Sequence, residues 1–196
     1  AAAKTRRKAA GRYWEGRYPG VTEEDALEWN TIRNHLRGEA AERAVSKWLD
    51  VAEVQHKRSG SVVEEMCFGE ADIVTAPHGV KIDVKSQHEL SEFMFYKAQW
   101  KEDPSIAIVW CGIVYDDVHR GDPGDASVAP RRVSILSWST LADIKQIDGE
   151  RVDALIADNK TTAEKAKAWK THRVGANRAR PLQHLLHSWI IGGKAP

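Results

Sequence analysis

The residues best suited to chemistry lie in one stretch, residues 69–87 (GEADIVTAPHGVKIDVKSQ). Asp72 and Asp83 stand on either side of a Pro-His-Gly turn, and Lys85 follows the second aspartate by two positions. Two carboxylates brought together can hold a hard divalent cation such as Mg²⁺, and a nearby ammonium group can move a proton or offset negative charge. The residue types therefore predict metal-assisted chemistry at this turn.

The segment 80–86 alternates apolar and polar residues, which is typical of a strand with one buried face. Asp83 and Lys85 share one face, and Gln87 joins them if the strand continues. The opposite, core-facing side carries Val80, Ile82 and Val84. The alternative interpretation is a surface hairpin with a solvated Asp-Lys face.

The pairing across the turn decides whether the two aspartates meet. If Thr75 pairs with Val80, residues 76–79 form the loop and Asp72 falls opposite Asp83, with Cβ atoms ~5 Å apart. Carboxylates at that separation repel each other unless a cation lies between them. A slip of one residue would turn Asp72 to the other face, so we commit to this register.

A helix predicted over residues 39–50 precedes the hairpin, after a break at Gly38 and an earlier helix over residues 22–36. At ~100° per residue, Glu42 lies at the border of the apolar stripe and can lean towards the sheet. Glu39 falls on the solvent side. The alternative for Glu42 is an ordinary border glutamate paired with Lys or Arg. The apolar stripe consists of Ala41, Ala44, Val45 and Trp48.

This order of residues resembles the PD-(D/E)XK nuclease superfamily, and its layout is similar to the Holliday junction resolvase-like and restriction endonuclease-like members. The resemblance extends from residue 38 to about residue 114. In two places the chain departs from the commoner pattern: Ala71 stands where a proline often precedes the first aspartate, and Asp83 replaces the commoner glutamate. The matching motif residues are Gly38 and Glu42 on the helix, Asp72, and Asp83-Val84-Lys85 on the hairpin strand.

The resemblance implies a Mg²⁺-dependent DNA endonuclease, with Mn²⁺ able to substitute. The implied metal ligands are Asp72, Asp83, the Val84 carbonyl and Glu42, directly or through water. It also implies that Lys85 orients or deprotonates the attacking water or neutralises developing charge, and that Gln87 contacts the DNA backbone or water. Resolvase, restriction, repair and homing types stay open, as does an exonuclease.

The remaining pattern predicts an α/β (α+β) fold with a central mixed sheet flanked by helices and extra C-terminal helices. We expect a basic arm (1–20), a nuclease core (21–138) and a helical basic extension packed on that core (139–196). A polar loop is predicted at 116–130, and residues 88–102 read as helical or irregular. Predicted strands span 51–55, 62–68, 71–75, 106–114 and 132–136, and predicted helices span 140–146 (capped by Ser139), 150–158, 162–171 and a last segment opened by Pro181 and closed by Gly192.

The net charge of +1 hides a segregation of charge along the chain. Residues 1–20 carry +5, residues 21–159 carry −11 and residues 160–196 carry +7. Basic ends can bind the phosphates of DNA, the expected partner. The alternative function is therefore a non-catalytic nucleic-acid-binding or assembly protein that uses the basic termini.

Other classes of protein are not favoured. No run approaches the ~18–20 apolar residues of a membrane span, so we expect no membrane partner. Cys67 and Cys111 make neither a CxxC zinc site nor a disulfide framework, which favours a cytoplasmic protein; a phage or mobile-element origin is open. A homodimer is expected if both strands of a duplex are cut.

Overall fold

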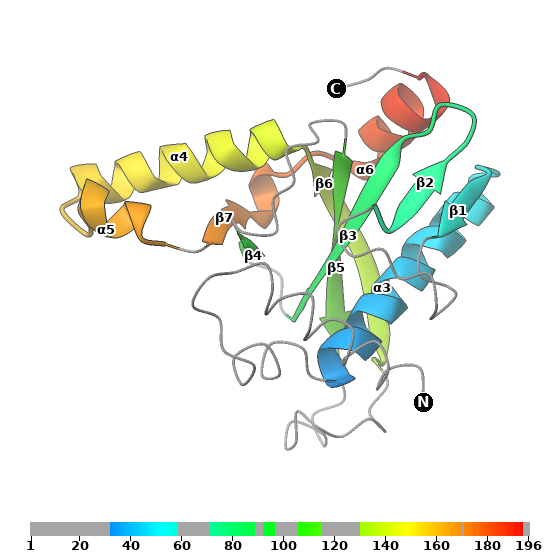
Figure 1. Ribbon diagram of the computed structural model, residues 1–196, viewed down its shortest axis with the longest axis horizontal. Helices are drawn as coiled ribbons and strands as arrows, with labels where there is room; N and C mark the ends of the chain where they lie inside the picture. The colour runs from blue at the N-terminus through cyan, green and yellow to red at the C-terminus, as the bar shows by residue number, and fades with distance from the viewer. Residues whose placement is uncertain are drawn as a thin grey trace, which may run out of the picture.

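The computed structural model describes residues 32–58, 71–88, 92–96, 106–114, 130–169 and 171–193. They form a five-stranded sheet, a two-stranded ribbon and the helices that cover them (Figure 1). Within these ranges no helix is both long and apolar enough to cross a membrane. The strands are β1 (His56–Arg58), β2 (Ile73–Thr75), β3 (Lys81–His88), β4 (Glu92–Tyr96), β5 (Ile106–Val114), β6 (Arg132–Ser139) and β7 (Thr171–Gly175). The helices are α3 (Ile32–Val51), α4 (Leu141–Ala157), α5 (Ala163–Lys167), the 3₁₀ turn η4 (Ala176–Arg178), α6 (Leu182–His184) and the π-helical η5 (Leu185–Ile191).

The main sheet is mixed, in the order β1-β2-β3-β5-β6. β1, β2 and β3 pair antiparallel, β3 and β5 pair parallel, and β5 and β6 pair antiparallel. A parallel pair needs a crossover, and β4 lies in that connection but pairs with β7 in the separate ribbon. The predicted mixed sheet flanked by helices is confirmed.

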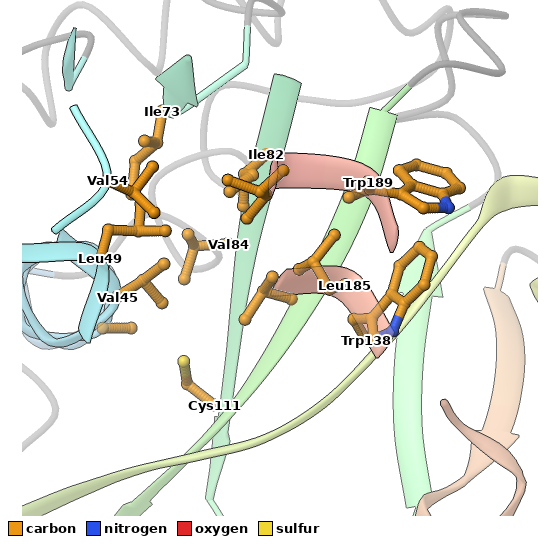
Figure 2. Packing of buried hydrophobic residues seen from close by; sticks show 14 of the residues in the cluster. Val45, Leu49, Val54, Ile73, Ile82, Val84, Cys111, Trp138, Leu185 and Trp189 are labelled. Atoms are coloured by element: carbon orange, nitrogen blue, oxygen red, sulfur yellow. The ribbon is translucent and has the colours of Figure 1, made fainter. Parts of the chain in front are cut away.

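One face of the sheet is covered by α3 together with the C-terminal helices (Figure 2). Val45 and Leu49 of α3 share a buried cluster with Ile82 of β3 and with Leu185 and Trp189 of the C-terminal segment. The apolar stripe predicted for residues 39–50 is therefore the face that packs. The last helix, opened by Pro181 and closed by Gly192, docks on the body of the protein.

The other face of the sheet is covered by the β4–β7 ribbon and α4. Phe93 stacks on Trp110 of β5 with ring centroids 4.7 Å apart, and Ile144 and Val174 complete this second cluster. Because clusters lie on both faces of β5, its side chains are buried on both, as the unbroken apolar run predicted.

Two predicted helix boundaries are wrong. α3 runs through Gly38, and α4 runs through Gly149 instead of ending at residue 146 and restarting at 150. A helical glycine costs only about 1 kcal/mol, which the packing of the helices outweighs. The cap of α4 is Thr140, whose hydroxyl accepts from the Asp143 N–H in a capping box, whereas Ser139 ends β6 and its hydroxyl accepts from Trp110 Nε1.

Several strand predictions need correction because long-range pairing decides them. Residues 51–55 end α3 and turn, and the strand begins at His56. Residues 92–96, predicted as helical or irregular, form β4, which pairs with β7. The helix predicted at 162–171 is shorter, because α5 ends at Lys167 and β7 begins at Thr171. β6 extends to Ser139, past the predicted end at 136. The predictions for 1–20, 22–31, 62–68 and most of 116–130 fall outside the described residues.

Gly149 offers a test of how α4 is stabilised. No atom lies within 4 Å of a Cβ built at Gly149, so Gly149→Ala should raise the free energy of unfolding by about 1 kcal/mol in urea denaturation. Gly79→Ala is the matched control, because its Cβ would also meet open space but its φ is +66°. It should lower stability by about 1 kcal/mol, and equal effects of the two variants would contradict this account.

Candidate functional site

The hairpin of β2 and β3 has the register predicted from the sequence. Ile73 lies opposite Ile82, and the Thr75 N–H donates to the Val80 carbonyl at 3.0 Å. Continuing this register by one pair places Asp72 opposite Asp83. Both isoleucines are fully buried, so the side chain of Asp83, which follows Ile82 in β3, lies on the other face of the sheet.

The carboxylate of Asp72 lies at the point where β2 has diverged from β3. Its Oδ2 accepts a hydrogen bond from the Val84 backbone N–H at 2.6 Å. A strand N–H points along the sheet towards the neighbouring strand, so its acceptor lies close to the plane of the sheet. The Asp72 side chain thus occupies the place of the missing β2 backbone. In an antiparallel ladder the Val84 carbonyl faces the same edge as its N–H.

Asp83 and Lys85 lie on the sheet face that carries the second cluster. Lys85 Nζ is 2.9 Å from Oδ1 and 2.8 Å from Oδ2 of Asp83, and it lies 5.7 Å from the centroid of the Phe95 ring. Both side chains are partly covered, with exposed fractions of 27% for Lys85 and 20% for Asp83. The aromatic ring and the aspartate together hold the lysine head group over β3.

Glu42 approaches the same place from the other face, on α3. It is buried, with 4% exposed, so the prediction that it leans towards the sheet is confirmed. Its charge acts on both Asp72 and Lys85. Glu39, predicted to be solvated, is only 28% exposed because it pairs with Arg43 and Arg58.

The charges of this cluster shift its ionisation. Burial, the charge of Asp83 and the charge of Glu42 raise the pKa of Asp72 well above its ordinary value. Burial alone would lower the pKa of Lys85, but the charges of Asp83 and Asp72 raise it. The cluster holds more carboxylates than Lys85 can neutralise, so it favours a further cation or a proton.

Gln87 lies on the same strand face as Asp83 and Lys85. The prediction required the strand to continue past Lys85, and β3 extends to His88. Its Nε2 donates to the Met94 carbonyl at 3.1 Å. In the structure Gln87 therefore ties β3 to β4. A contact of Gln87 with a DNA backbone or water stays a prediction.

The donor set suits a magnesium-type ion with few protein ligands. Among the described residues, no group of three or more His, Cys, Asp or Glu side chains could hold a metal ion as arranged. Mg²⁺ commonly binds one or two carboxylates and keeps several waters. Asp72 and Asp83 with the Val84 carbonyl fit that pattern, and Glu42 would act through water.

Phe95 is the site contact that sequence reasoning missed. It belongs to β4, which was predicted as helical or irregular. The signal was present in residues 92–96, where buried Phe93 and Phe95 alternate with Glu92 and Met94. The long-range partner that makes this segment a strand, β7, lies about eighty residues later in the chain.

Asp72→Asn should change stability in a pH-dependent way when no divalent ion is present. A raised carboxyl pKa means that the folded state binds the proton more tightly than the unfolded state, whose pKa is ~3.9. Wild-type stability is therefore lost as the pH rises through the folded pKa, whereas Asn stays neutral and still accepts from Val84. Urea unfolding should show the variant gaining on wild type from pH 4 upwards.

Asp158→Asn serves as the control for this measurement, because Asp158 is 59% exposed and pairs only with Lys160 among the described residues. Its difference from wild type should be small at every pH. An Asp72→Asn difference that stays constant from pH 4 to pH 8 would contradict the electrostatic account.

The structure thus brings Glu42, Asp72, Asp83 and Lys85 together, and it gives Gln87 a bond to β4. What this arrangement does must be argued from its geometry and chemistry. A comparison with protein-family models, curated proteins and solved structures found no match to the chain.

Proposed function

We propose that this protein is a Mg²⁺-dependent endonuclease that hydrolyses DNA phosphodiester bonds. One observation carries the proposal: Lys85 is paired to Asp83 on β3, and Asp72 is bonded to the Val84 N–H beside them. Glu42 on α3 is close enough for its charge to act on Asp72 and Lys85. This is the set of residues whose order resembles the PD-(D/E)XK motif. The resolvase, restriction, repair and homing types stay open within this proposal.

The topology supports a restriction endonuclease-like fold within this proposal. A helix packs on a hairpin whose second strand carries the motif, and that strand pairs parallel with the apolar β5. Asp72 lies one residue before β2, next to the part of β3 that carries Asp83 and Lys85. Function is assigned to these residues and not to the fold, because one fold can host many activities.

Each residue of the cluster has a proposed role. Asp72, Asp83 and the Val84 carbonyl would hold the ion, and Glu42 would complete its shell through water. A bound Mg²⁺ supplies positive charge next to the phosphate and lowers the pKa of water. These hard oxygen donors also accept Mn²⁺.

Lys85 is placed to change partners when a cation is present. Its Nζ now bonds both oxygens of Asp83, which are also the proposed ligands of the ion. A cation bound there would offset the charge of Asp83, which would leave the Lys85 ammonium group able to pair with the scissile phosphate. It would then stabilise the charge that develops on the phosphate oxygens and orient the attacking water.

The alternative, a non-catalytic binding protein that uses the basic termini, loses part of its support. Three arginines of the C-terminal segment are bound to acidic residues of the same chain. Arg173 pairs with Glu92, Arg178 with Glu150, and Arg180 with Asp143. Three of the eight Lys and Arg residues in 160–196 therefore bind the body of the protein.

Cleavage of plasmid, linear and branched DNA tests the proposal. Wild type should cleave with Mg²⁺ or Mn²⁺ and not with EDTA, while Asp83→Ala and Lys85→Ala should lose at least about a hundredfold in rate, since each removes transition-state stabilisation. Asp158→Ala is the matched control, since it removes an exposed aspartate paired with Lys160.

Equal cleavage by wild type and Asp83→Ala would overturn the proposed function. DNA binding that survives Asp83→Ala, needs no divalent ion and leads to no cleavage would instead support the binding-protein alternative. Comparing the three substrates separates endonuclease from exonuclease and identifies a preference for branched DNA.

A homodimer is part of the proposal, since a two-fold pair of chains matches the symmetry of a duplex cut in both strands. Light scattering should then give twice the 21.9 kDa of the chain in the cleaving species. An active monomer would remove this part and leave the chemistry unaffected.

A further inference from the structure

A row of exposed side chains crosses the main sheet next to the carboxylate cluster. Lys57 of β1 lies opposite Val74 of β2, and Val74 lies opposite Lys81 of β3. All three are exposed, Val74 to 39%, although a sheet interior usually covers valine. We call Lys57, Val74 and Lys81 the lysine row.

The lysine row lies on the same sheet face as the site. Side chains two residues apart on a strand point the same way, so Lys81 shares a face with Asp83, and Val74, which lies opposite Lys81, points to that face too. The rows are ~6.8 Å apart along the strands, and neighbouring strands are ~4.8 Å apart. Both ammonium groups, on long flexible stems, can therefore reach a chain that passes over the carboxylates.

This face is covered unevenly. The β4–β7 ribbon covers it beside Lys85, where Phe95 lies over the ammonium group. β1 and β2, which carry Lys57 and Val74 of the lysine row, lie on the other side of β3 from the β4–β7 ribbon (Figure 1). The opposite face of the sheet is covered here, since Ile73 of β2 and Ile82 of β3 are fully buried under helices.

Charge indicates what would bind there. Three carboxylates at the site repel a phosphate chain, so a substrate phosphate needs cations close to its path. Lys57 and Lys81 provide two positive charges beside the aspartates, with the apolar surface of Val74 between them. Such a surface suits a sugar–phosphate backbone, whose charged oxygens alternate with apolar sugar carbons.

We propose that the lysine row binds the DNA backbone next to the scissile phosphate and positions it over Asp72 and Asp83. The inference rests on the proposed nuclease function and adds the side from which the substrate enters. Lys57 and Lys81 are positioning residues, since neither is placed at the reacting atoms.

The experiment measures binding of the full chain to a fluorescein-labelled DNA duplex as a function of salt. Ca²⁺ replaces Mg²⁺ to occupy oxygen ligands, and gels check that the DNA stays intact. Lys57→Gln and Lys81→Gln should each reduce the slope of log K against log salt by about 0.9, the value for one lost phosphate contact, and Lys57→Arg should keep it. Lys47→Gln is the matched control, because Lys47 is exposed on α3, on the other side of the sheet.

Cleavage kinetics add a second readout. The two glutamine variants should lower kcat/KM severalfold at low DNA concentration and leave kcat nearly unchanged, since backbone binding and not chemistry is removed. If both glutamine variants had the salt slope and the cleavage rate of wild type, the proposal that the lysine row binds the DNA backbone would be wrong. The proposed nuclease function would be unaffected. No cleavage by wild type on any substrate would overturn the proposed function itself.

Discussion

Ile73 and Ile82 lie opposite each other in the β2–β3 hairpin, and both are fully buried beneath α3 and the C-terminal helices. Each buried isoleucine contributes roughly 1.5–3 kcal/mol of hydrophobic free energy. A slip of one residue would expose at least one of them and carry Asp72 into the core. Burial of this pair thus fixes the register that brings Asp72 beside β3 and near Asp83, although the repulsion between the two carboxylates opposes that arrangement.

Local patterns explain what the sequence could predict. The alternation of apolar and polar residues in 80–86, together with the Pro-His-Gly turn, was enough to predict the hairpin, its register and the shared face of Asp83 and Lys85. The apolar stripe was enough to turn Glu42 towards the sheet. All of these features depend on residues close in sequence or on a single turn, so they can be predicted from the spacing of apolar residues.

Other features depend on partners far along the chain. β4 pairs with β7, and Phe95 reaches Lys85 only because of that ribbon. The helices continued through Gly38 and Gly149, since the cost of a glycine is small compared with the packing of a whole helix. The partner of β4 cannot be identified from residues near it in the sequence, so the missed contacts with β4 are those that depend on non-local pairing.

The charge distribution also has a different meaning once the pairs are known. Asp148, almost completely buried, accepts from Arg151, His172 and the Arg173 N–H, and so fastens β7 to α4. Three arginines of residues 160–196 that count towards a phosphate-binding segment are paired with acidic residues of the same chain. Positive charge near the site comes instead from lysines on the sheet.

The ribbon has a consequence for how the protein is made. Lys85 and Gln87 are held by β4, and the described strand that pairs with β4 is β7, residues 171–175. A nascent chain that has emerged only as far as α4 has Glu42, Asp72, Asp83 and Lys85, but no strand to hold Phe95 over the lysine. The cluster is thus completed only after residues 171–175 have been made, and a product truncated before residue 171 would carry every motif residue without the finished site.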